Sequence, residues 1–293
     1  MIVDNGIKIA LNRTAGISPA YTASSRFQVG INQATVAVAD NAITFPIPIN
    51  STETVDACEA TTGWTAGTDG AITTNSTTYK QGSYSLNLTK NAATADNVIW
   101  YKETEPSLDF TSKTIYGWVY IIDAAALAKL ATSSALEVRY GNDYNTNYYK
   151  FVYDNADLAV GWNLIYFTTT TGTQVGTVTL NACDSLGVKL TFTATSDTTS
   201  AGDIVIDDFK LSSSGDYYKN YESGYPSVDE TKFEITEKCY LNSTDANGFN
   251  ITGIGTFNTD ATAKAESIFK ITSMSKSDTD EFSYIVKKRL TRR

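Results

Sequence analysis

An aromatic and polar run between residues 139 and 149 holds the side chains best suited to bind a ligand. Its sequence, Arg-Tyr-Gly-Asn-Asp-Tyr-Asn-Thr-Asn-Tyr-Tyr, mixes ring faces with amide and carboxylate groups. A sugar needs both types, because aromatic faces contact its C–H groups while polar groups bind its hydroxyls. The candidate binding residues are Tyr140, Asn142, Asp143, Tyr144 and Tyr148. The alternative is that these tyrosines belong to a hydrophobic core.

Other aromatic residues are further candidates for the same face, namely Tyr101, Trp118, Tyr120 and Tyr153. Aromatic side chains of a two-sheet protein lie in the core more often than on its surface. A core position is therefore favoured for Trp118 and Trp162.

The elements that position these residues are β-strands. Between residues 53 and 214, apolar and polar residues alternate in short runs that end at turn-forming clusters, as in an antiparallel β-sandwich. One Ala-rich stretch, 123–130, predicts a short helix instead. The expected strands are 84–88, 97–102, 113–121, 135–140, 148–153, 162–167, 186–192 and 204–211.

Two segments in this region resemble the opening and closing strands of a carbohydrate-binding jelly roll. One is YKQGSYSLNL at 79–88, a glycine turn that leads into an alternating strand, and the other is GDIVIDDFKL at 202–211. The resemblance implies a self-contained jelly-roll module at 53–214. It also implies glycan binding.

Jelly rolls of this kind often carry a structural calcium ion between their first and last strands. The matching positions here are Glu59, the backbone of 80–83, and Asp207 and Asp208. Calcium prefers six to eight oxygen ligands, and a cation relieves the repulsion between neighbouring carboxylates. The alternative is that the two aspartates end a strand in solvent.

The sequence offers little for catalysis. It contains no His, which excludes Ser-His and Cys-His nucleophile pairs and His-dependent metal sites. Its carboxylates are scattered, without the paired spacing of a glycosidase. Cys58, Cys183 and Cys239 match no zinc or redox motif and are expected to be free buried thiols. We therefore expect a protein that is not an enzyme.

Length and charge limit the remaining possibilities. A chain of 293 residues suits two compact domains, and a net charge of −9 argues against nucleic acid as a partner. The basic cluster Lys287-Lys288-Arg289 is expected to be a solvated strand end. We expect no membrane insertion, because no apolar run approaches the roughly 20 residues that a spanning helix needs. The N-terminus also lacks a signal-peptide pattern, so export by the usual secretory route is not expected.

The N-terminal segment is too small to bury a core alone and is expected to form one β-rich frame domain with the C-terminal segment, 1–52 with 215–293. Their turn and strand pattern, VDNGIKIALNR, F-x-VG, LNSTDANG and SKSDTDEFSYIVKKRL, resembles virion appendage proteins of tailed bacteriophages, such as tail fibres. This resemblance implies location on the phage particle surface, contacts with other virion proteins and assembly as a homotrimer.

Together these observations predict an all-β protein in which an antiparallel jelly-roll sandwich is inserted into a smaller β-rich frame. The leading functional hypothesis is a phage tail fibre or similar appendage that uses the module to adhere to host-surface glycans. One alternative is an architectural capsid decoration or neck protein that binds no sugar. A third is an accessory module of a secreted glycan-degrading enzyme.

Overall fold

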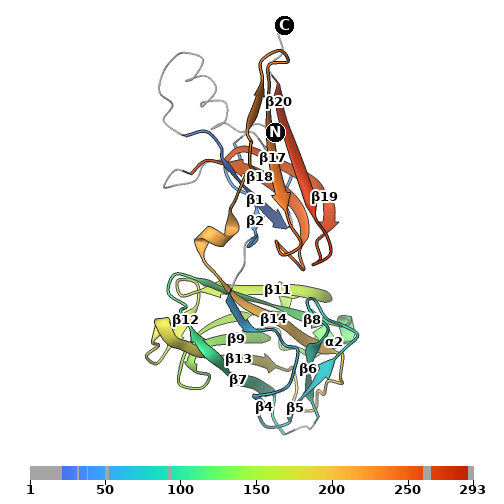
Figure 1. Cartoon of the computed structure of the whole chain (residues 1–293). Coiled ribbons are helices and arrows are strands. Elements are labelled where there is room, and N and C mark those ends of the chain that lie inside the picture. The colour runs from blue at the N-terminus through green and yellow to red at the C-terminus, as the bar shows by residue number, and fades with distance from the viewer. Residues whose placement is uncertain are drawn as a thin grey trace. The chain divides into compact units, whose positions relative to one another are not determined.

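The computed structural model describes residues 22–31, 33–37, 39–49, 53–91, 94–259 and 265–289, with only the backbone at 104–106. The chain divides into two compact units (Figure 1). The inserted unit comprises residues 52–213, and the frame unit comprises 1–51 together with 214–293. Neighbouring strands in both units pair antiparallel, so the predicted all-β antiparallel fold is confirmed.

The inserted unit is a β-sandwich of two sheets, which we name after a central strand of each. The β9 sheet has the strand order β12 (Thr173–Val175), β10 (Asn147–Tyr153), β9 (Leu136–Asp143), β13 (Cys183–Thr191), β7 (Asn97–Leu108) and β4 (Trp64–Ala66). The β8 sheet has the order β11 (Gly161–Thr168), β8 (Thr114–Ile121), β14 (Ile204–Ser212), β6 (Ser85–Lys90) and β5 (Gly70–Asn75), with β3 (Glu53–Asp56) also paired to β14.

Alternation along each strand separates the core from the surface, because successive side chains of a strand point to opposite faces. In β7, for example, Val98 and Trp100 are buried while Ile99 and Tyr101 are partly exposed. The aromatic rings inside the sandwich meet edge to face. Phe110 lies 5.3 Å from Tyr140 and 5.9 Å from Phe167, measured between ring centroids. One continuous core therefore joins the two sheets.

The predicted short helix is present as α2 (Ala124–Lys129). Asp123 caps it, since its Oδ1 accepts a hydrogen bond of 2.7 Å from the Ala126 N–H. Short 3-10 helices lie at Asn155–Asp157, Leu180–Ala182 and Ser214–Tyr217.

The frame unit contains two smaller sheets. One has the order β15 (Lys219–Asn220), β1 (Arg26–Ile31), β18 (Asn250–Phe257) and β19 (Ala265–Ser275), with β2 (Phe45–Pro46) also paired to β1. The other has the order β16 (Ser227–Asp229), β17 (Glu234–Leu241) and β20 (Phe282–Arg289). The N-terminal strand β1 thus takes its partners β15 and β18 from the C-terminal segment. The motif predicted at 2–13 lies outside the described residues.

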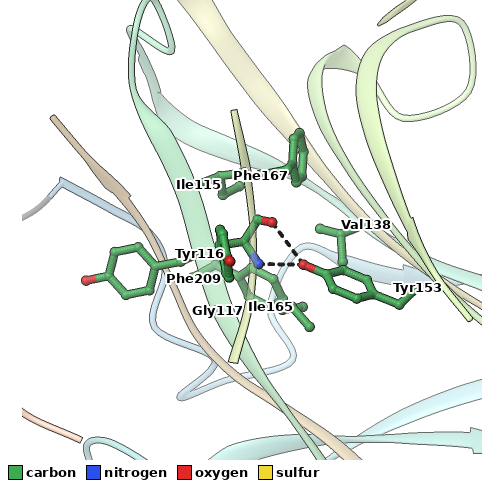
Figure 2. A pocket seen from close by; sticks show the side chains of 9 residues that line it. Ile115, Tyr116, Gly117, Val138, Tyr153, Ile165, Phe167 and Phe209 are labelled. Carbon is green, nitrogen blue, oxygen red and sulfur yellow. Dashed lines mark hydrogen bonds between the residues drawn. The ribbon is translucent and has the colours of Figure 1, made fainter. Parts of the chain in front are cut away.

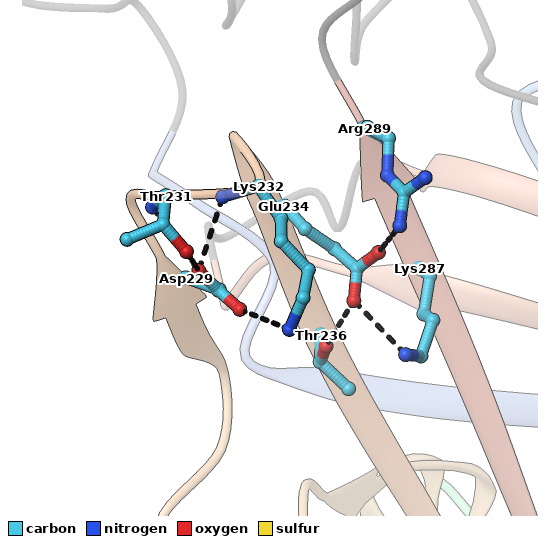
Figure 3. Close-up of polar contacts among 7 residues, drawn as sticks. All are labelled: Asp229, Thr231, Lys232, Glu234, Thr236, Lys287 and Arg289. Carbon is cyan, nitrogen blue, oxygen red and sulfur yellow. Dashed lines mark hydrogen bonds and ion pairs between the residues drawn. The ribbon is translucent and has the colours of Figure 1, made fainter.

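The basic cluster near the C-terminus forms ion pairs within the frame unit. Lys287 and Arg289 bind the two carboxylate oxygens of Glu234 on the neighbouring strand, at 3.0 and 2.7 Å (Figure 3). Lys288, on the opposite side of β20, lies between Glu237 at 2.6 Å and Glu266 at 2.9 Å, and its side chain is only 11% exposed. The prediction of a solvated strand end is therefore wrong for Lys288, because two carboxylates hold it inside the unit.

All three cysteines are fully buried and unpaired in the structure. Within the described part of the chain, no helix has the length and apolar character needed to cross a membrane.

Candidate functional site

The outer face of the β9 sheet carries a row of residues that crosses all six strands. Each member pairs in register with the next, so the row is set by backbone geometry. Adjacent strands are about 4.8 Å apart, which makes the row ~24 Å long. From β4 to β12 its members are Thr65, Tyr101, Gly187, Arg139, Lys150 and Thr173.

A stacked pair of tyrosines forms the aromatic end of this row. Tyr144, in the turn between β9 and β10, lies over Tyr101 of β7 with ring centroids 3.5 Å apart and planes at 14°. A side-chain hydrogen bond with Tyr101 raises the pKa of Tyr144 to about 12. Both rings remain partly exposed.

Gly187 leaves the space that this stack requires. It lies on β13, between the strands that carry Tyr101 and Arg139. A Cβ placed there would already touch the Cβ atoms of Tyr144 and Arg139, each at 3.4 Å. A longer side chain at this position would compete with the Tyr144 ring for the same space.

Arg139 connects the stack to the middle of the row. Its Nη1 donates a 2.8 Å hydrogen bond to the Tyr144 carbonyl, and its guanidinium lies 4.6 Å from the Tyr148 ring centroid. Its Nε donates to Glu137 Oε1 at 2.5 Å, and Lys150 Nζ binds Glu137 Oε2 at 3.3 Å. These contacts hold the turn and the charged side chains in one arrangement on a rigid sheet.

Three of the predicted sugar-binding residues are used for structure instead. Tyr140 points into the core with 0% exposure, and its hydroxyl donates to the Cys183 carbonyl. The Asn142 amide ties β9 to the 179–182 segment through both its Oδ1 and its Nδ2. Asp143 Oδ1 accepts from the amides of Asn145 and Thr146 and so holds the turn. The prediction that Tyr140 offers its ring to a ligand is therefore wrong.

The remaining two predicted residues do lie on the outer face. Tyr144 is half of the stack, and Tyr148 lies beneath the Arg139 guanidinium with only 6% exposure. Four further residues of this face were not among those predicted, namely Glu137, Arg139, Gly187 and Lys189. Alternation with the buried Leu136, Val138, Val188 and Leu190 indicates that they point outward. Alternation does not indicate that they lie close to one another.

The other aromatic candidates separate onto different surfaces. Tyr101 shares the face of Tyr144, but Trp118 and Tyr120 belong to strand β8 of the other sheet. Tyr153 points inward and its hydroxyl binds the backbone of Tyr166. One shared aromatic face for all four was therefore a wrong prediction, because alternation does not reveal which sheet a strand joins.

The residues predicted to hold calcium lie near one another, around the turn at 80–84. Asp207 Oδ2 accepts from the amides of Lys80 at 2.6 Å and Gln81 at 3.0 Å. The Glu59 carboxylate accepts from the amides of Ser83 and Tyr84. The turn thus presents N–H donors to both carboxylates, an arrangement that partly neutralises them.

Asp207 and Asp208 are buried, so the alternative of a strand end in solvent is wrong. Burial raises the pKa of Asp207 to about 7 against the opposing effect of the two amide hydrogen bonds, and Asp208 and Glu59 raise it further. Burial also raises the pKa of Asp208, although Lys210 binds its Oδ2 at 2.7 Å. Burial thus disfavours negative charge at this position.

The fit of this cluster to calcium is incomplete. Asp207 Oδ1 is buried without a hydrogen-bond partner among the described residues, as expected of an oxygen that could bind a cation. However, no three acidic, His or Cys side chains in the described ranges converge closely enough to hold a metal ion. The calcium site therefore stays a prediction.

A small apolar cavity lies between the two sheets, beneath the edge strand β11. Figure 2 shows the Tyr153 hydroxyl pointing from the β9 sheet towards the backbone of β11 across this space. Because this hydroxyl is already bound to the Tyr166 backbone and the rest of the lining is mainly apolar, the cavity is a poor site for a polar ligand. It is lined by Ile115, Tyr116, Gly117, Val138, Tyr153, Ile165, Tyr166, Phe167 and Phe209.

Comparison with known proteins finds no matching family model and no matching curated protein. Solved structures do show similarity. They include a family 11 carbohydrate-binding module from Clostridium thermocellum in complex with a β-1,3-1,4-mixed-linked tetrasaccharide, with 13% identity over 55% of this chain and 95% of that chain and a TM-score of 0.39. The module TmCBM61 in complex with β-1,4-galactotriose has 15% identity over 53% of this chain and 90% of that chain, with a TM-score of 0.30. An exo-β-agarase has 12% identity over 55% of this chain and 25% of that chain, with a TM-score of 0.39.

Proposed function

We propose that the outer face of the β9 sheet binds an oligosaccharide laid across its strands. The observation that carries this proposal is the Tyr101–Tyr144 stack, aligned in register with Arg139 and Lys150. The stack supplies ring surface for sugar C–H groups, and the charged side chains and Thr65 and Thr173 supply hydrogen-bonding groups. A row of ~24 Å is long enough for several sugar rings.

The proposed role is binding without catalysis. The charged groups at the centre of the face, Glu137 with Arg139 and Lys150, are bound to one another. A glycosidase of the usual kind needs two carboxyl groups on either side of the scissile bond. Glu137 is bound to two cations and Asp143 to two turn amides, so neither is placed to act as a member of such a pair.

The setting that we propose is the surface of a phage particle, where the frame unit attaches to other virion proteins and the inserted unit meets host glycans. This part of the proposal rests on the sequence resemblance of the chain ends. Assembly as a homotrimer would present three weak sites together, and their combined avidity would exceed the affinity of each. Mass spectrometry of purified particles should then identify this chain, and light scattering should give the mass of a trimer.

A calcium ion held by Glu59, Asp207 and Asp208 is the remaining part of the proposal. The unpartnered, buried Asp207 Oδ1 supports it. The ion would neutralise carboxylates that burial otherwise destabilises, and so would stabilise the sandwich without touching the sugar.

The experiment that tests the binding role is a glycan array probed with the full-length chain, once with calcium and once with a chelator. Tyr144→Ala should lose the signal, while Tyr166→Ala, which removes a 48% exposed tyrosine from the β8 sheet, should keep it. No signal from a folded wild-type protein would favour the architectural alternative. Equal signal from both variants would place the site elsewhere.

A further inference from the structure

Positively charged side chains gather in one part of the outer face of the β9 sheet, although the whole chain has a net charge of −9. Arg139 and Lys150 are paired in register, and in the next row Lys189 is paired with Glu137. Three cations thus surround one carboxylate on adjacent strands. Such a local reversal of sign needs a physical reason, because like charges on neighbouring strands destabilise a sheet.

The single carboxylate is fully occupied by two of the cations. One Glu137 oxygen binds Arg139 Nε and the other binds Lys150 Nζ, and the Glu137 side chain is only 9% exposed. The Lys150 side chain is 31% exposed, so its ammonium is still accessible to a ligand. Glu137 therefore holds Arg139 and Lys150 in position, and its single negative charge does not neutralise both of their positive charges.

Lys189 has no such partner. Among the residues that the structure describes, it makes no ion pair, although it lies directly opposite Glu137. On β7, the strand on the other side of β13, Lys189 is paired in register with Ile99, which is apolar. The Lys189 charge is consequently directed to solvent on the face that we propose as the binding site.

Carboxylates on the same face lie at its other end. Glu103 and Asp143 both lie close enough to Tyr144 to raise its pKa, so they flank the aromatic stack. The Asp143 carboxylate already accepts two turn amides. The face is therefore polarised along its strands, with acidic groups beside the stack and the free positive charge in the row of Lys189.

We propose that the ligand of this face is an acidic glycan, whose carboxylate or sulfate groups bind Lys189 and Lys150 while a ring of the same chain packs on the Tyr101–Tyr144 stack. This inference rests on the proposed function. Charge complementarity explains the retained cations, since opposite charges across an interface steer association and select the partner. A neutral glycan would leave the Lys189 charge without a role in binding.

The test is a glycan array of acidic glycans, each paired with its carboxyl-reduced or desulfated counterpart, probed with the full-length chain at low and at physiological salt. The strongest acidic hit and its neutral counterpart are then titrated against wild type and Lys189→Gln. Lys129→Gln, which removes the same charge from helix α2 with a side chain 35% exposed, is the control.

We expect the acidic member of each bound pair to be preferred, with the preference reduced by salt. Lys189→Gln should lower the affinity for the acidic ligand about 2- to 5-fold, as expected for the loss of one exposed charge pair. It should leave the affinity for the neutral ligand unchanged. Lys129→Gln should change neither. Carboxylated and sulfated members of the array distinguish the two sources of charge.

Two results would overturn the inference in distinguishable ways. Equal binding of acidic and neutral members, unaffected by Lys189→Gln, would reject the acidic ligand and keep glycan binding. No binding of any member by a protein with a cooperative melting transition would reject the proposed function together with it.

Discussion

Tyr144 and Tyr101 are 43 positions apart in the sequence, yet their rings stack with centroids 3.5 Å apart. The contact crosses strand β13, which lies between β9 and β7, at the one position where that strand has a glycine. The stack is thus a product of three strands. Of the three tyrosines predicted to bind sugar, Tyr140, Tyr144 and Tyr148, Tyr144 is the one that is not buried.

Tyr144→Ala and Tyr140→Ala should have opposite effects. Loss of the Tyr144 ring should weaken glycan binding about 10-fold, from a stacking energy of ~1.5 kcal/mol, and leave unfolding little changed. Loss of Tyr140 should cost about 3 to 5 kcal/mol of stability, because its ring fills the core. Calorimetry of binding and chemical denaturation measure the two effects. A large loss of stability in Tyr144→Ala would return that residue to a structural role.

Substitutions of Gly187 should show a graded effect on the stack. Gly187→Ala should be tolerated, since its Cβ would meet neighbours at the ordinary contact distance of 3.4 Å. Gly187→Leu should displace Tyr144 and weaken glycan binding while the protein stays folded. Near-ultraviolet circular dichroism reports the change in the stacked tyrosines.

Gly117→Ala is a contrasting substitution, because its Cβ would lie 2.5 Å from the Phe209 ring. This overpacking should lower the free energy of unfolding by about 1 to 3 kcal/mol.

Stability in the presence of a chelator should fall as the pH rises from 4 to 7. Burial raises the Asp207 pKa from 3.8 to about 7, so in this range the folded state binds more protons than the unfolded state. By linkage, stability is greatest below the unfolded pKa and is lost as the pH rises towards the folded pKa, by up to ~4 kcal/mol. Burial also raises the pKa of the neighbouring Asp208, which therefore contributes to the profile in the same direction.

The measurement is the melting temperature of wild type and Asp207→Asn from pH 4 to 8, with chelator and with calcium. Asp207→Asn should flatten the profile, because the amide does not titrate. Calcium should raise the wild-type melting temperature at pH 7 and leave that of the variant unchanged. A wild-type profile that is flat with chelator would contradict the buried, protonated carboxyl, and a lack of response to calcium would contradict the proposed ion.

Tyr153→Phe should weaken the edge of the β8 sheet without affecting the binding face. The Tyr153 hydroxyl donates to the Tyr166 carbonyl at 2.9 Å and accepts from the Tyr166 N–H at 2.7 Å. Removing it should cost about 1 kcal/mol and speed amide exchange at Tyr166. The control is Tyr149→Phe on the same strand, whose hydroxyl binds the exposed Gln174 side chain at 2.7 Å. Equal exchange at Tyr166 in both variants would show that the Tyr153 hydroxyl does not protect this edge.

The local pattern of the chain was sufficient to predict its strands and the direction of most side chains. Alternation in LEVRY at 136–140 and LGVKL at 186–190 separates buried Leu and Val from outward Glu137, Arg139 and Lys189. The same alternation, read more strictly, would have placed Tyr140 inside, since it continues the series of Leu136 and Val138. The Ala-rich helix and the burial of the cysteines also follow from composition and pattern.

What alternation does not contain is the identity of each strand's neighbours. Strand β8 alternates as clearly as β7, yet Trp118 and Tyr120 belong to one sheet and Tyr101 to the other. Long-range pairing depends on how the two sheets together bury their apolar faces. The sequence by itself determined which residues face outward. Only the tertiary structure decided that β7, β13 and β9 lie side by side, and this register places Tyr101, Tyr144, Arg139 and Lys189 on one surface.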